Sequence, residues 1–465
     1  MAAADLSDDG IRRAVAELLP GLVTDLVELA AIPSVAANGF PAEPLFDAHR
    51  AVVDLLTRCG VAGIGRLVVP GTTAPILTAT IPGPATAPTV LIYSHYDVAP
   101  AGDPGRWRTP PFTPVRTDGA VFGRGTADSK SNIAMLAGML QVLGDRPPVT
   151  VKLILEGQEE FGSPFDDFPP RHPELFHADA MVIADVGSIR PGTPSLTVAL
   201  RGAASVEVRV RSLEHDLPCG RYEGAAPDAR LALIRALASL HDDAGNVAVP
   251  GLLREPWPGA GYSDEEFRRL VEVPDGVALQ GTGTVAERIW SGPAITVTGF
   301  DAPPADAPQN LIAGTARAMI SLRVHPNQDV AEAQAALVDH LRRQHPHGSR
   351  LEVTPGPVSA GFAARLGGPG QRAAMRALYR AWGTPVEVMA GGASIPVVAA
   401  LHRAVPTAET VMFGATDGYS RLHQEDERVL VDEIEKAIVA MVIFLRDYGS
   451  TGLRDPTNRR EDSDG

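Results

Sequence analysis

Short apolar runs alternate with helical patterns towards both ends of this chain, and this alternation constrains the fold more than any other feature. The apolar runs are rich in β-branched side chains and predict strands at residues 76–81, 90–94, 149–155 and 180–184. Apolar positions at helical spacing predict helices at residues 11–31, 46–58, 131–143, 371–382, 395–402 and 432–446. Such alternation indicates an α/β fold in which a central mixed sheet is flanked by helices.

One local signal lies inside the first predicted helix. Pro20 and Gly21 occupy its middle, and proline lacks the N–H group that a helix interior uses. We therefore expect a break or kink there. The same helix is expected to end near Ile32, because a residue that precedes proline avoids the helical region.

The middle of the chain has a different order of elements. Strand-like runs at residues 204–210, 295–297, 316–324 and 351–354 enclose helical patterns at residues 228–240 and 330–343. This β-α-β-β-α-β order is enough for a small two-layer domain of its own. We therefore predict a catalytic domain in two parts, residues 1–199 and 354–450, interrupted by an inserted domain of residues 200–353. The polar residues 451–465 are predicted to form a disordered tail.

Charge and cysteine content exclude several classes of partner. The 465 residues include 56 acidic and 41 basic side chains, and this balance of -15 argues against nucleic acid or an acidic membrane as partner. Cys59 and Cys219 form no CxxC pair, so a metal ion would need His and carboxylate ligands. The first residues lack a secretory signal, and the longest apolar run, residues 437–445, is too short to span a membrane. We expect an acidic cytoplasmic enzyme.

Two polar motifs precede or follow predicted elements in a way that suits metal binding. His95 and Asp97 stand two apart at the end of strand 90–94, so the carboxylate can orient the imidazole of a metal ligand. Asp128 lies in a glycine-rich loop before a helix, where its two oxygens could bind two cations. Each motif also has a purely structural interpretation. His95 and Asp97 could simply lie at the exposed end of a strand, and Asp128 could cap the following helix.

Three further motifs add candidate ligands. Glu159 and Glu160 follow an apolar strand, and adjacent acids are tolerated best when a cation neutralises one of them. Asp185 follows the next strand, and His423 lies in an acidic loop. Ligand sites in α/β sheets form beyond the carboxyl ends of strands. Two His and three carboxylates suit two divalent cations, zinc first, with manganese or cobalt as alternatives.

The ordered series HxDV, GRGxxD, EGxEExGS, a lone Asp and a late His resembles the zinc-dependent exopeptidase family. That family includes carnosinase-type dipeptidases, aminoacylase and succinyl-diaminopimelate desuccinylase. By this resemblance His95 and Asp185 bind one metal ion. Glu160 and His423 bind the other, and Asp128 bridges the two.

The same resemblance implies a mechanism. Asp97 braces His95, and Glu159 is the general base and acid that activates a metal-bridged water for attack on an amide carbonyl. The family also keeps a cis peptide after the bridging acid, here between Asp128 and Ser129. The implied enzyme is a metal-dependent hydrolase of a small carboxylate-bearing amide, first of all a dipeptidase.

The inserted domain resembles the family's lid and dimerisation domain, which implies a homodimer. Arg323 matches the residue that grips the substrate carboxylate, and Asn310 matches a polar lid position near the substrate. Gly392 and Ser394 belong to a segment that resembles the family's GGSIP, where backbone amides favour a carboxylate. These four residues are the predicted substrate contacts.

One departure from the family stands out. The lid usually places a histidine at the partner's metal centre, and this chain has Pro218 there, with His215 and Arg221 as the nearest replacements. Two alternatives to a dipeptidase therefore remain open: an N-acyl-amino-acid deacylase or specialised biosynthetic amidohydrolase, and a non-hydrolytic protein that binds a small molecule on the same scaffold.

Overall fold

The computed structural model describes residues 6–344 and 346–451, and the chain divides into two compact units. The first unit is built from the described residues up to Val198, from Ala364–Met389, and from those that start at Val397. The second unit comprises Ala199–Ala363 and Ala390–Pro396. The predicted tail, apart from Thr451, lies outside the described residues.

Most of a nine-stranded mixed sheet lies in the first unit. Its strand order is β1-β2-β6-β3-β7-β18-β9-β16, and β17 also pairs with β9. The bounds are β1 Gly65–Leu67, β2 Ile76–Ile81, β3 Thr89–His95, β6 Thr150–Glu156, β7 Ala180–Ile183, β9 Ser195–Leu200, β16 Phe362–Ala363, β17 Glu387–Gly391 and β18 Glu409–Met412. Strands β6, β3, β7 and β18 are parallel, whereas β2 and β9 are antiparallel to their neighbours. The predicted central mixed sheet is confirmed.

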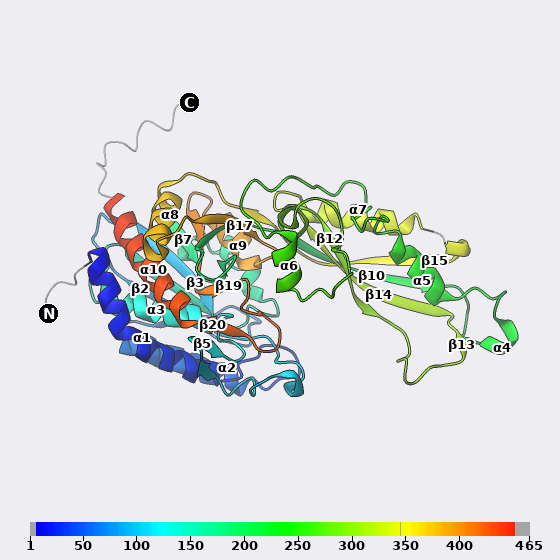
Figure 1. The fold of residues 1–465 in the computed structure, drawn as a ribbon, viewed down its shortest axis with the longest axis horizontal. Coiled ribbons are helices and arrows are strands. Elements are labelled where there is room, and N and C mark those ends of the chain that lie inside the picture. The colour runs from blue at the N-terminus through cyan, green and yellow to red at the C-terminus, as the bar shows by residue number, and fades with distance from the viewer. Residues whose placement is uncertain (1–5, 345, 452–465) are drawn as a thin grey trace, which may run out of the picture. The chain divides into compact units, whose positions relative to one another are not determined.

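Helices cover this sheet. The bounds are α1 Asp8–Ala30, α2 Glu43–Arg58, α3 Lys130–Leu143, α8 Pro369–Trp382, α9 Pro396–Ala404 and α10 Val431–Thr451. Helices α1 and α3 both pack against α10, and α8 packs against α10 on another side (Figure 1). Two small sheets complete the unit: β4 Val115–Thr117 and β5 Ala120–Phe122 with β20 Arg428–Leu430, and β8 Gly187–Ser188 with β19 Thr416–Asp417.

Of the break or kink expected in the first helix, the break is wrong. Helix α1 is continuous, and Pro20 lies inside it. Leu22, Val23 and Leu26 are buried where the helix packs on its neighbours. Burying such side chains stabilises a protein by roughly 1.5–3 kcal/mol each, which outweighs the cost of about 3 kcal/mol for an internal proline.

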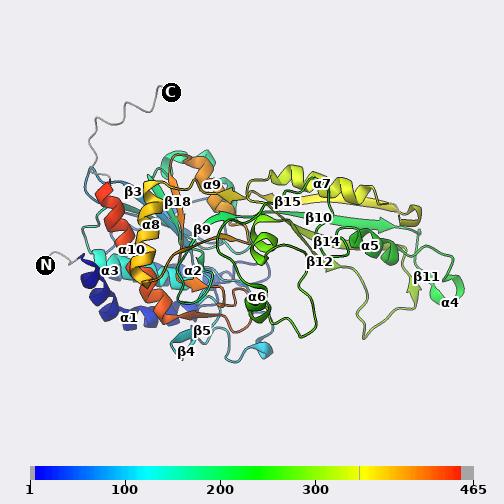
Figure 2. The ribbon, with the colours of Figure 1, turned by 45° about the horizontal axis from the view of Figure 1, so that its top comes forward.

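The second unit has the predicted β-α-β-β-α-β order. Its sheet has the order β12-β14-β10-β15 and every pair is antiparallel, with bounds β10 Gly202–Arg211, β12 Ala294–Phe300, β14 Thr315–Val324 and β15 Arg350–Ser359. Helices α5 Ala229–Ala238 and α7 Val330–Arg342 pack on this sheet (Figure 2). Shorter elements are β11 Leu217–Pro218, α4 Cys219–Tyr222, α6 Asp264–Leu270 and β13 Leu311–Ile312.

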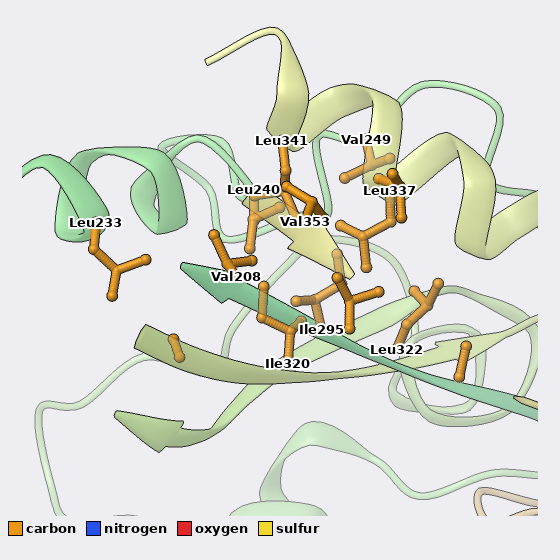
Figure 3. Packing of buried hydrophobic residues seen from close by; sticks show 14 of the residues in the cluster. Val208, Leu233, Leu240, Val249, Ile295, Ile320, Leu322, Leu337, Leu341 and Val353 are labelled. Carbon is orange, nitrogen blue, oxygen red and sulfur yellow. The ribbon is translucent and has the colours of Figure 1, made fainter. Parts of the chain in front are cut away.

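A single cluster of apolar side chains holds that unit together. Leu233 of α5 and Leu337 and Leu341 of α7 pack against Val208 and Ile320 from the sheet (Figure 3). Alternate residues of β10 and β14 are buried, as expected for strands with one covered face. The unit therefore has a hydrophobic core of its own.

Within residues 6–344 and 346–451, none of the helices is long and apolar enough to cross a bilayer.

Candidate metal centre

Three parallel strands of the first unit bring polar side chains to one edge of the sheet. Strand β3 ends at His95, which is in register with Glu156 at the end of β6. Strand β7 lies on the other side of β3 and ends at Ile183, in register with Tyr93. The residues that follow these strands, including Glu159, Glu160 and Asp185, therefore leave the sheet at the same edge.

A glycine permits the close approach of two of these segments. A Cβ atom at Gly157 would lie 2.4 Å from Cζ and from the hydroxyl oxygen of Tyr96. Any larger residue at this position would force either the buried Tyr96 side chain or the segment before Glu159 to move.

Asp97 organises the neighbouring ligands. Its Oδ1 atom lies 3.2 Å from Nδ1 of His95, which leaves Nε2 of that imidazole directed at other groups. The same carboxylate accepts the backbone N–H of Glu159 at 3.0 Å and that of Glu160 at 3.1 Å. Asp97 is fully buried, so one side chain fixes both the imidazole and the two adjacent acids.

Asp128 lies between the two histidines. Its Oδ1 atom is 3.0 Å from Nε2 of His95, and its Oδ2 atom is 3.0 Å from Nε2 of His423. The peptide bond between Asp128 and Ser129 is cis, as the family resemblance implies. Asp128 thus contacts two imidazoles through two different oxygens.

Each imidazole has one further carboxylate partner. Nε2 of His95 lies 3.0 Å from Oδ1 of Asp185, and Nε2 of His423 lies 2.9 Å from Oε2 of Glu160. The other oxygen of Glu160 accepts the N–H of Ala99 at 3.0 Å. His423 is exposed, while the carboxylate of Glu160 is buried.

The geometry fits two divalent cations. A ring nitrogen carries at most one hydrogen, yet each Nε2 atom faces two carboxylate oxygens at hydrogen-bond distance. Ligand atoms about 2.1 Å from one cation and at right angles are about 3 Å apart, which matches these separations. Among the described residues, two groups could each hold an ion: His95 with Glu159 and Asp185, and Asp128 with Glu160 and His423.

Electrostatics supports the same conclusion. Burial, and next the charge of Asp185, raises the pKa of Glu159 well above its usual value. Burial and then Asp128 raise the pKa of Glu160 in the same direction. Burial disfavours protonated His95, but neighbouring carboxylates, first Asp185, raise its pKa well above normal. The raised pKa values mean that these side chains hold protons because their negative charges are crowded together. Bound divalent cations would neutralise the same charge.

The structure therefore brings together all seven residues predicted for the metal centre, and their individual roles stay a prediction. Glu159 fits two roles. Its carboxylate belongs to the donor group of His95 and Asp185, and it is also the predicted general base.

The predicted substrate contacts lie in the second unit. Nη1 of Arg323, on β14, donates to Oγ of Ser394 at 3.2 Å. The carbonyl of Gly392 accepts a hydrogen bond from Nε of Arg201 at 3.0 Å. Asn310 is exposed in the loop before β13, and its carbonyl accepts the N–H of Cys219 at 3.1 Å. Arg323 and Ser394 are therefore in contact, and Asn310 instead borders the Pro218 position.

The sequence analysis missed Arg201, which is buried beside Arg323. Burial and the charge of Arg323 lower the pKa of Arg201 to about 10. Across residues 6–344 and 346–451, neither arginine forms an ion pair with a carboxylate. In the sequence, the one feature that could have drawn attention to Arg201 is its position directly after an apolar strand and before Gly202.

Pro218 lies in β11, which pairs with β13 opposite Leu311. Both suggested replacements, His215 and Arg221, are exposed, and the guanidinium of Arg221 stacks over the ring of Tyr222 at 5.4 Å.

Comparisons with known proteins agree with this geometry. The sequence profile of Peptidase family M20/M25/M40 matches residues 91–447. The chain is 36% identical over 371 residues to the cysteinylglycine-S-conjugate dipeptidase of Corynebacterium striatum, covering 78% of this chain and 82% of that protein. It is 26% identical over 381 residues to the Beta-Ala-His dipeptidase of Homo sapiens, covering 76% and 74%.

Two solved structures share the fold. The di-peptidase Dug1p from Saccharomyces cerevisiae matches with a TM-score of 0.83 at 20% identity, covering 96% of this chain and 99% of that one. Human carnosine dipeptidase 1 matches with a TM-score of 0.82 at 22% identity, covering 95% and 99%.

A mixed α/β sheet with carboxylates and imidazoles gathered at one edge defines a metal-dependent hydrolase. The chain belongs to Peptidase family M20/M25/M40. The predicted resemblance, fold class and enzyme class, a metallopeptidase of the dipeptidase type that uses divalent metal ions, are therefore confirmed.

Proposed function

We propose that this chain is a dinuclear zinc dipeptidase whose substrates are dipeptides with a free carboxylate, cysteinylglycine and its S-conjugates first among them. The observation that carries the proposal is the pair of donor groups joined by Asp128, with Glu159 at one of them. The relative from Corynebacterium striatum supports the cysteinylglycine class because it is 36% identical to this chain.

In this proposal His95 and Asp185 hold one ion, and Glu160 and His423 hold the other. Asp128 bridges them, in keeping with its contacts to both imidazoles. When bound, the ions supply Lewis acidity that polarises the scissile carbonyl and acidifies a water molecule. Zinc is the first choice, and manganese or cobalt would suit the same carboxylate-rich donors.

The protein's own residues then handle the proton. Glu159 accepts a proton from the attacking water and returns it to the leaving amine. Asp97 holds the backbone N–H of Glu159, which fixes the position of the base. Asp97 also orients His95 and so acts as a positioning residue.

The second unit would bind the substrate carboxylate. Arg323 is the principal contact, with Ser394, Gly392 and Asn310 around the same substrate. Two guanidinium groups without a carboxylate partner among the described residues, those of Arg201 and Arg323, support an anionic ligand there.

Arg323→Lys is expected to raise KM for dipeptides by roughly 10- to 100-fold, with a smaller change in kcat, because lysine keeps the charge but loses the planar fork. Steady-state kinetics measures this. Arg317→Lys is the matched control, since Arg317 lies on the same strand and pairs with Asp301 at 2.9 Å. An unchanged KM in Arg323→Lys would remove Arg323 from the substrate site.

We further propose that residues 200–353 act as a lid and dimerisation domain of a cytoplasmic homodimer. Sedimentation or light scattering of the full chain tests the dimer directly.

Pro218→His is expected to raise dipeptide hydrolysis, by up to about 100-fold, if an oxyanion contact is missing. Pro218 has φ -65° and ψ 130°, an extended conformation that histidine adopts without strain. Rates are compared with the wild type after the oligomeric state has been checked. An unchanged rate in a correctly assembled protein would mean that another residue already supplies the contact.

A substrate panel tests the proposed function. Metal-loaded full chain is expected to hydrolyse dipeptides that carry a free carboxylate, with Glu159→Gln as the inactive control. If the chain hydrolyses N-acyl amino acids but no dipeptide, its assignment as a dipeptidase is wrong. If it binds small molecules tightly but cleaves no amide, its assignment as an enzyme is wrong.

A further inference from the structure

The loop that carries His423 has an unfavourable backbone. Arg421, His423 and Asp426 have φ values of 55°, 59° and 59°, although none of them is glycine. This left-handed region is disfavoured for residues with a Cβ atom, and such conformations persist only where surrounding contacts enforce them. The loop therefore needs an anchor near His423.

Glu427 supplies that anchor. It is fully buried, and its Oε1 atom accepts the backbone N–H groups of Ala127 at 2.9 Å and Asp128 at 3.0 Å. Its own carbonyl accepts the N–H of Gly123 at 2.9 Å. Glu427 thus joins the loop of one candidate ligand, His423, to the backbone of another, Asp128.

Arg124 completes the connection. Its Nη1 atom lies 2.5 Å from Oε2 of Glu427, and its Nη2 atom donates to the carbonyl of Pro100 at 3.2 Å. The guanidinium also stacks over the ring of Trp107, 5.3 Å from its centroid. Only 1% of Arg124 is exposed. The chain that leaves Asp97 is therefore tied to the same ion pair.

The two loops begin where a small sheet ends. Strand β20 pairs with β5, and Arg428 is opposite Phe122, so Glu427 and Gly123 continue the ladder by one more residue (Figure 1). A buried ion pair contributes little to stability compared with apolar residues of the same size. The pair instead fixes the distance between the loop of His423 and the loop of Asp128.

We propose that Glu427 and Arg124 form a positioning pair that sets the separation of His423 from Asp128 and thereby the affinity for the second metal ion. This inference rests on the metal ligands of the proposed function. Neither residue is a ligand, and both act through the backbone of the ligand loops.

Glu427→Gln is the direct test. Glutamine keeps the size and one oxygen for the two backbone N–H groups, but its NH₂ group cannot accept from Arg124. We expect the affinity for the zinc ion held by His423 and Glu160 to fall about 10- to 100-fold, as for other groups that orient ligands. Competition with a chromophoric chelator on the full chain measures it. At saturating zinc, KM for a dipeptide should stay unchanged.

Glu433→Gln is the matched control. Glu433 is also buried, and it accepts the N–H of Gly192 at 2.9 Å and Nε1–H of Trp382 at 3.1 Å, away from the candidate ligands. This variant should lower thermal stability without changing zinc affinity. If zinc affinity falls equally in Glu427→Gln and Glu433→Gln, Glu427 only stabilises the fold and the proposal is wrong.

A second variant covers the case in which Glu427→Gln does not fold. Arg124→Lys keeps a positive charge near Glu427 but loses the planar fork that also reaches Pro100, so it should lower zinc affinity less than Arg124→Gln does. Wild-type zinc affinity in Arg124→Gln would also overturn the pair. A wild-type chain that binds two zinc ions but cleaves no dipeptide would refute the proposed function and leave this test intact.

Discussion

Glu159→Gln is expected to keep both metal ions while turnover falls by about two to four orders of magnitude. Glutamine preserves the size of the side chain but cannot accept the proton of the attacking water. The backbone N–H of Glu159 still reaches Asp97, so the segment should keep its position. Metal analysis together with kcat for a dipeptide measures both parts of this expectation.

Glu160→Gln gives the contrast. The carboxylate of Glu160 lies 2.9 Å from His423 and belongs to the second donor group. We expect this variant to lose one ion, because an amide is a weaker ligand than a carboxylate. If Glu159→Gln loses an ion and Glu160→Gln keeps both, the two roles must be exchanged.

The second large effect concerns Asp128. Asp128→Asn should weaken both ions at once and reduce turnover by more than about 100-fold, because even groups that only orient a ligand are worth 10- to 100-fold. The wild-type carboxylate offers one oxygen to each side, towards His95 and towards His423. Asparagine retains one oxygen, and its NH₂ group binds no cation. Isothermal titration with zinc measures the affinity of each site.

Asp185→Asn is the comparison for that experiment. Asp185 contacts only one of the two imidazoles, that of His95. This variant should therefore weaken a single ion and leave the site of His423 and Glu160 intact. Equal losses in Asp128→Asn and Asp185→Asn would contradict a bridging role for Asp128.

Much of the metal centre could be predicted from the sequence. His95 ends a strand, and Glu160 and Asp185 follow strands, and strand ends are visible in local patterns of apolar residues. The parallel order of β6, β3 and β7 then brings those ends to one edge. The late histidine, His423, was a weaker candidate from its acidic loop alone, and only the family resemblance gave it a place in the ligand set.

The fold class was predicted correctly, and the failure of Pro20 to break the first helix has a physical reason. The predicted strands and helices of both units are present, but five strands of the large sheet, β1, β9, β16, β17 and β18, were not predicted. Pro20 did not break α1, because burial of Leu22 and Leu26 in the packed helix outweighs a local preference.

The sequence by itself determined the kinds of donor in this protein and their places at the ends of its elements, because backbone periodicity and residue chemistry are local properties. Only the tertiary structure decided which of them meet. His423 reaches Asp128 across 295 positions, and Glu427 accepts the N–H of Asp128 across 299. Hydrogen bonds between such distant residues depend on how the whole sheet and its loops pack, and no local pattern encodes that packing.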